Sequence, residues 1–224
     1  MDNPSAPLGK NLRGRDLSGE RMFGAELNNA DLSGAKLVKT RLSGAELNDA
    51  NLSDANLEGA SMNRAQLKNA DLTNANLTGV KFQEANLSGA NLTGATLTGT
   101  NFNEANLSST IFGAAILAGN DLSNANLSKA DLTAANLSGA IFSNSKLNGA
   151  SLSGADLRSA NLSGADLSNA NLSGVQLENA DITNVNFKGA NLSNANLRGL
   201  NLYGCNITQA NLSGATLPDG TKSR

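Results

Sequence analysis

The chain has 224 residues, with 17 basic and 19 acidic side chains and a formal net charge of −2. This balance does not favour a nucleic-acid binder, and a chain with no histidine and one cysteine offers neither an internal disulfide nor a familiar metal site. No apolar run approaches the ~20 residues of a membrane span, so we expect a cytoplasmic protein that binds no membrane.

One repeat accounts for almost the whole chain. Residues 1–9 contain two prolines and no repeat, and we expect them to be an unstructured lead-in. Residues 10–219 divide into 42 consecutive pentads without an insertion, and residues 220–224 form a polar tail. The pattern therefore predicts a single repeat domain over residues 10–219.

We number the positions of each pentad one to five, beginning at residues whose number ends in 0 or 5. Position three is Leu in 33 of the 42 pentads and is apolar in the others, whereas position one is mostly Ala. Position two is mostly Asn or Asp, position four is mostly Ser or Thr, and position five holds 20 of the 23 glycines. This period fits three extended residues and a bend, with positions one and three inward and position two outward. Since one triplet is too short to be stable alone, successive coils must stack.

The pentad Ala-(Asp/Asn)-Leu-X-X, as in residues 130–134, resembles the pentapeptide-repeat family over residues 10–219. The resemblance implies an all-β fold: a right-handed quadrilateral parallel β-helix of about ten coils, with no capping helix. Residues 34–42 and 217–220 resemble segments of cyanobacterial members, including a regulator of heterocyst differentiation.

Several departures from the repeat are candidate interaction residues. On a four-sided coil, Arg21, Arg41, Arg64 and Lys81 fall on or beside one column, next to an outward Phe23. A basic strip beside an aromatic ring can bind an acidic protein surface, and an ordinary solvated face is the alternative.

A second candidate surface is apolar. Ile111, Ile116 and Ile141 occupy outward positions that elsewhere hold polar residues. They could form an interaction patch, but we expect them on different sides, and scattered surface hydrophobes are the alternative. The nearby Asn120 should point inward, bond to Thr100 or to a backbone group, and widen the coil locally.

The sequence contains no constellation that supports catalysis, because it lacks histidine and any phosphate-binding glycine motif. We therefore expect no enzyme activity, no cofactor, no metal and no small-molecule substrate. The expected function is a protein-interaction scaffold, with regulation of the partner as one form of that role. It presents rigid β-helix faces to an unidentified protein partner, either as a monomer or as an end-to-end homodimer. Two alternatives are a DNA mimic that binds a type II topoisomerase, which the near-neutral charge disfavours, and a purely structural rod.

Overall fold

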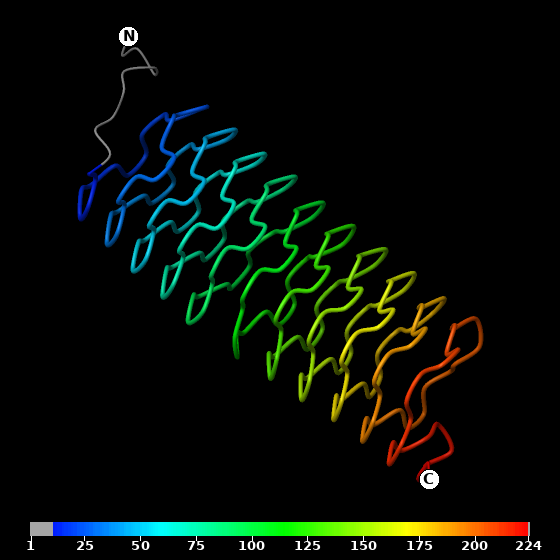
Figure 1. Cartoon of the computed structure of the whole chain (residues 1–224). Coiled ribbons are helices and arrows are strands. Elements are labelled where there is room, and N and C mark those ends of the chain that lie inside the picture. The colour runs from blue at the N-terminus through cyan, green and yellow to red at the C-terminus, as the bar shows by residue number, and fades with distance from the viewer. Residues whose placement is uncertain (1–10, 224) are drawn as a thin grey trace.

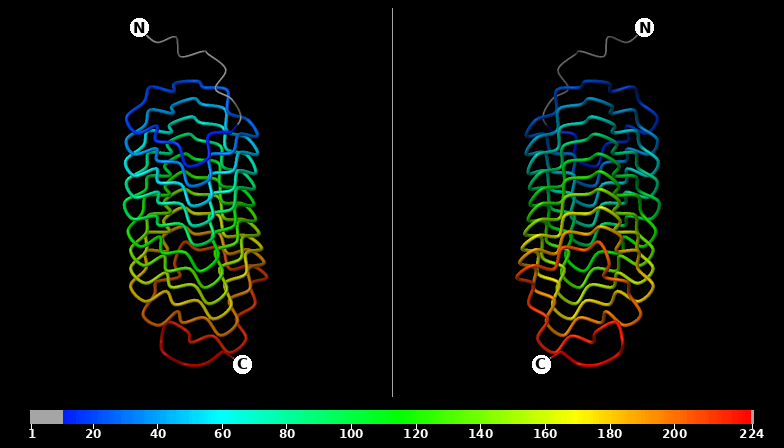
Figure 2. Two further views of the ribbon diagram at one scale, coloured as in Figure 1. Left: turned by 90° about the vertical axis from the view of Figure 1, so that its left-hand side faces the viewer. Right: turned by 90° about the vertical axis from the view of Figure 1, so that its right-hand side faces the viewer.

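The computed structural model describes residues 11–223, which form an elongated rod of stacked coils (Figures 1 and 2). These residues contain no helix, hence none long enough to cross a membrane, and no extended strand; single-residue parallel bridges recur along the chain instead. Every parallel bridge joins residues twenty apart, so four pentads (20/5) complete one coil. The chain is thus a β-helix, as the pentad pattern predicts. The expected lead-in at residues 1–9 lies outside the described residues.

Hydrogen bonds between neighbouring coils hold the rod together. In the pentad that begins at residue 160, the Asn161 N–H donates to the Ala140 carbonyl of the preceding coil at 2.9 Å. The Leu162 N–H donates to the Asp181 carbonyl of the following coil at 2.7 Å. Each coil therefore pairs with both of its neighbours, and an inserted residue would shift every later pair out of phase.

The bend of each pentad explains its polar positions. The Ala165 N–H donates to the Leu162 carbonyl at 2.9 Å, and Gly164 at position five has φ 68°, where glycine pays no steric penalty. The Asn161 Oδ1 atom accepts the position-four Ser163 N–H at 3.0 Å and the Ser163 hydroxyl at 2.7 Å. Position two thus supplies the acceptor for the one N–H that the ladder leaves free.

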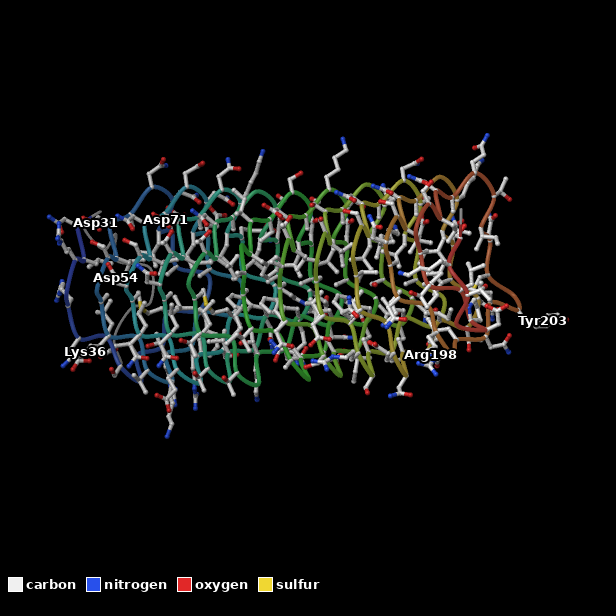
Figure 3. All side chains as sticks on the ribbon, turned by 90° about the horizontal axis from the view of Figure 1, so that it is seen from below. Asp31, Lys36, Asp54, Asp71, Arg198 and Tyr203 are labelled. Atoms are coloured by element: carbon white, nitrogen blue, oxygen red, sulfur yellow. The ribbon has the colours of Figure 1, made fainter. Side chains whose placement is uncertain are left out.

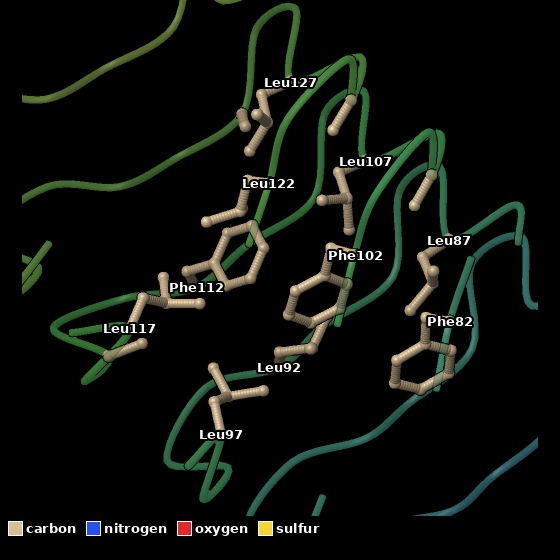
Figure 4. Close-up of a cluster of buried hydrophobic side chains, with 14 of the residues drawn as sticks. Phe82, Leu87, Leu92, Leu97, Phe102, Leu107, Phe112, Leu117, Leu122 and Leu127 are labelled. Atoms are coloured by element: carbon tan, nitrogen blue, oxygen red, sulfur yellow. The ribbon is translucent and has the colours of Figure 1, made fainter. Parts of the chain in front are cut away.

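Side chains at positions one and three fill the interior. Leu167 is 0% exposed, which confirms the predicted phase of the repeat. Larger residues replace leucine in the middle of the rod, where the Phe82 and Phe102 rings stack with centroids 5.4 Å apart (Figure 4). Phe112 meets Phe102 edge-on at 6.2 Å. The stacking of residues twenty apart follows directly from the coil length.

Polar residues that point inward are all satisfied by main-chain carbonyls. Each one donates to the carbonyl of a position-three residue; the set is Thr40, Thr100, Thr110, Asn120 and Ser145. The Asn120 Nδ2 atom donates to the Leu97 carbonyl at 2.8 Å, which confirms the expected bond to a backbone group.

The ladder is interrupted near Asn120. Thr96 and Ile116 form no bridge to each other, although Thr96 bridges to Asn76 and Ile116 to Asn136 in the same column. The N–H groups that lose their coil-to-coil bonds here are those of Gly94, Leu97, Gly99, Ala114, Ile116 and Asp121. The adjoining turn also differs, because Gly113 takes the positive φ (52°) at position four instead of position five. Residues 113–114 are a Gly-Ala pair, whereas the repeat places its glycines at position five; this reversal explains the altered turn.

The end of the described chain folds back on the rod. Thr216 and Lys222 form an antiparallel bridge, and the Ser223 N–H donates to the Ala215 carbonyl at 2.8 Å. This short hairpin covers the edge of one side of the last coil. Tyr203, which is 89% exposed, projects from the same end (Figure 3).

The role of position two can be tested at Asn161. Asn161→Ala leaves the Ser163 N–H without its acceptor and should lower the free energy of unfolding by about 1 kcal/mol. Ser163→Ala keeps that N–H bond and removes only the hydroxyl contact, so it should cost less. Urea unfolding followed by circular dichroism measures both, and equal losses would contradict this assignment.

Acid should weaken the rod through its position-two aspartates. Hydrogen bonds from the Ser33 hydroxyl and N–H hold the pKa of Asp31 below its ordinary value of 3.8. Because the folded-state pKa is lowered, this contribution is present above the unfolded-state pKa and is lost as pH falls through the folded-state value.

Asp31→Asn keeps an acceptor oxygen and removes the titration. Its unfolding midpoint in urea should therefore fall less than that of the wild type when the pH is lowered from neutral to below 3.8. An identical acid dependence in both proteins would be inconsistent with the role of this carboxylate.

Hydrogen exchange should report the interruption in the ladder. The Leu97 and Ile116 amides lack a coil-to-coil bond, whereas the Leu77 amide, one coil earlier on the same side, donates to the Thr96 carbonyl at 2.8 Å. We expect Leu97 and Ile116 to exchange well before Leu77 in exchange experiments read by NMR. Equal protection would show that the ladder is continuous in solution.

Candidate functional site

The structure places three of the predicted basic residues in one column. Arg21 bridges to Arg41, Arg41 to Ser61 and Ser61 to Lys81. Neighbouring members of such a column are about 4.8 Å apart, and Arg21, Arg41 and Lys81 are exposed. We call the side that carries this column the Arg21 side.

Arg64 is close to that column but has a different environment. It lies at position five, on the corner of the Arg21 side, and its guanidinium binds the Glu84 carboxylate through contacts of 2.9 and 3.0 Å. The bidentate contact lowers the pKa of Glu84 and raises that of Arg64. Arg64 is therefore already neutralised, unlike the basic residues of the column.

Phe23 lies beside the column, in the same coil as Arg21. It occupies position four of the Arg21 pentad and is 48% exposed. An aromatic ring at a position that mostly holds Ser or Thr gives the Arg21 side an apolar contact beside its charge.

A polar pocket of about 470 Å³ opens on the same side. Its lining comes from three successive coils: Ser43, Gly44, Asn63, Arg64, Gln83 and Glu84. The Ser43 hydroxyl lies 3.0 Å from the Ser61 hydroxyl, so the pocket adjoins the basic column directly. The Asn63 Oδ1 and Gln83 Oε1 atoms are covered from solvent and have no hydrogen-bond partner.

Sequence reasoning missed this pocket, although a signal was present. Asn63, Gln83 and Asn103 place three amides in succession in a position-four column that begins with Phe23 and Ser43. A comparison of position-four residues that are twenty apart would have identified this change from Ser or Thr to amides.

The three outward isoleucines do not form one patch. Ile111 bridges to Asp131, Ile116 to Asn136 and Ile141 to Asn161, so they belong to three columns on different sides. Their exposed fractions are 43%, 67% and 39%, respectively. Ile111 and Ile116 flank the altered turn at Gly113 and form a small apolar corner, whereas Ile141 shares the Arg21 column.

Reactive groups are sparse among residues 11–223, which contain no cluster of His, Cys, Asp or Glu able to hold a metal ion. Burial raises the pKa of the Cys205 thiol, which donates to the Ile182 carbonyl at 3.1 Å. The thiol is therefore neutral at pH 7 and is not an activated nucleophile.

Solved structures with repeat folds resemble the chain. HetL of the cyanobacterium Nostoc sp. strain PCC 7120, a pentapeptide repeat protein involved in heterocyst differentiation regulation, is 35% identical over 95% of this chain and 91% of its own, with a TM-score of 0.36. A pentapeptide repeat protein of the Arabidopsis thaliana thylakoid lumen is 34% identical over 47% of this chain and 74% of its own, with a TM-score of 0.46. QnrB1, a plasmid-mediated fluoroquinolone resistance protein, is 22% identical over 68% of this chain and 84% of its own, with a TM-score of 0.40.

No curated protein matches the chain. The family model of pentapeptide repeats, in contrast, matches overlapping segments that run without a gap from residue 11 to residue 218. These segments include the whole bridged ladder from Asn11 to Thr216. The chain therefore belongs to the pentapeptide repeat family.

Proposed function

We propose that this chain is a non-catalytic scaffold that binds a protein partner through one side of its rigid rod and thereby regulates that partner. The observation that carries the proposal is the Arg21 side, where a column of exposed cations with no ion-pair partner within residues 11–223 adjoins a polar pocket. Most of the remaining surface repeats the same Asn, Ser and Thr contacts, which offer little to distinguish one partner from another.

The chemistry of the side chains supports a function without catalysis. The sequence has no histidine for proton transfer, and its single thiol has a raised pKa. Carboxylates that could act as acids or bases lie on the convex outer surface, as Figure 3 shows for Asp31, Asp54 and Asp71. An outer surface of this kind does not enclose a substrate.

We further propose the finer geometry that the family resemblance implies: a right-handed coil, about ten coils in the repeat domain and no capping helix. The spacing of twenty residues between bridges and the absence of helices from residues 11–223 support the last two points.

Binding of a protein can be tested directly. The full chain, immobilised, should capture a partner from an extract of the organism that encodes it, and the purified pair should then bind in isothermal titration calorimetry. The double variant Arg21→Gln/Arg41→Gln should bind more weakly, because it removes two exposed cations without touching the core. If no captured protein binds when purified, the scaffold proposal is wrong.

A supercoiling assay tests the topoisomerase alternative. With a net charge of −2 and a basic column on one side, the chain should not inhibit a purified type II topoisomerase. Strong inhibition would replace the scaffold proposal with the DNA-mimic one.

A further inference from the structure

We infer that the Arg21 side binds an extended, acidic segment of the partner protein, with carboxylates on the Arg21–Lys81 column and main chain along the polar pocket. This inference rests on the proposed scaffold function and adds the chemistry of the segment that is recognised.

The basic residues of the column replace the Asn or Asp of the repeat without adding contacts that stabilise the rod. Arg21 and Arg41 stand directly opposite each other in the ladder, an arrangement that like charges destabilise. Neither side chain has an ion-pair or hydrogen-bond partner among residues 11–223. The Phe23 and Ser43 N–H groups also lack the side-chain acceptor that is supplied in pentads with Asn or Asp at position two, such as Asn161 for Ser163. The repulsion between like charges and the missing acceptor both occur at this column. Such local losses of stability are expected where binding, and not folding, determines which residues are present.

An acidic column on the next side behaves differently. Glu26 and Glu46 are also directly opposite each other, but the Glu46 carboxylate accepts a hydrogen bond from Asn28 Nδ2 at 2.9 Å. The arginine column has no comparable partner within the described residues, which leaves its charge available to an external anion.

The shape of the pocket suits an extended chain. Its lining comes from three coils, which span about 10 Å along the rod at ~4.8 Å per coil and match about three residues of extended peptide. The Asn63 and Gln83 side-chain oxygens lack donors. Because the terminal torsion of an amide side chain rotates easily, a small rotation would turn these oxygens towards the N–H groups of a bound segment.

The charge pattern favours carboxylates of a protein over nucleic acid. The Arg64–Glu84 pair at the pocket is internally neutral, so the column contributes only three free cations. Stable binding to a nucleic acid usually draws on more phosphate contacts. Three cations and an exposed Phe23 match a short acidic segment that also carries apolar side chains.

The test uses a fluorescein-labelled decaglutamate peptide and the full chain, with fluorescence anisotropy at about 0.05 M salt, where surface charges are weakly screened. The wild type should bind, and binding should weaken as salt rises. Arg21→Gln/Arg41→Gln should raise the Kd about tenfold.

Two further variants separate the column, the pocket and overall charge. Lys146→Gln/Lys188→Gln makes the same change in net charge on a different side of the rod and should leave the Kd unchanged. Ser43→Gln introduces at position four the side chain that Gln83 already has there, and should weaken binding by narrowing the pocket without any change in charge. Circular dichroism should show the same fold for all variants.

Several outcomes would overturn the inference. Equal weakening by the two charge variants would indicate non-specific attraction, and tighter binding of an oligothymidylate of equal length would indicate nucleic acid. A second copy of the chain would be the occupant of the Arg21 side if sedimentation shows that the wild type is a dimer and that Glu26→Gln/Glu46→Gln is a monomer. If decaglutamate does not bind while a purified partner still binds wild type and Arg21→Gln/Arg41→Gln alike, the acidic-segment inference fails and the scaffold proposal survives.

Discussion

The rod depends on main-chain hydrogen bonds between residues twenty apart. Each coil obtains its acceptors and donors from the coils before and after it, so no pentad is stable by itself. This requirement accounts for the unbroken register over residues 10–219, because a single insertion would direct every later leucine to solvent. The ladder lacks a bridge between Thr96 and Ile116 and again between Asp181 and Asn201, yet the register is retained at both places. At the first of them the Asn120 amide bonds to the Leu97 carbonyl.

A second constraint is local and explains the character of the surface. The N–H at position four is left free by the ladder, and an Asn or Asp at position two accepts it. Stacked amides also bond to one another, as Asn126 Nδ2 does to Asn106 Oδ1 at 3.2 Å. The abundance of Asn and Asp therefore reflects stability, and residues that give up this bond are the informative ones. Arg21 and Arg41 belong to that set, which comprises the 16 of the 42 pentads without Asn or Asp at position two.

Parts of the candidate site followed from the sequence and others did not. The Arg21, Arg41 and Lys81 column could be predicted once residues twenty apart were placed together. The pairing of Arg64 with Glu84 could not, because it depends on which rotamers two long side chains adopt at a corner. The pocket beside Ser43 also depends on side-chain conformation, at Asn63 and Gln83, although the succession of amides in that position-four column marks its place in the sequence.

By itself, the sequence determined the repeat length, the inward direction of residues such as Leu167 and the polar character of the outer positions, because these follow from a strict period and from burial of apolar side chains. Four sides per coil came from family resemblance, and the bridges between residues twenty apart establish them independently. Only the tertiary structure decided where the ladder opens beside Ile116, how residues 221–223 fold back on the last coil, and which cations remain unpaired within residues 11–223. Those features depend on contacts between coils, which a pentad does not encode.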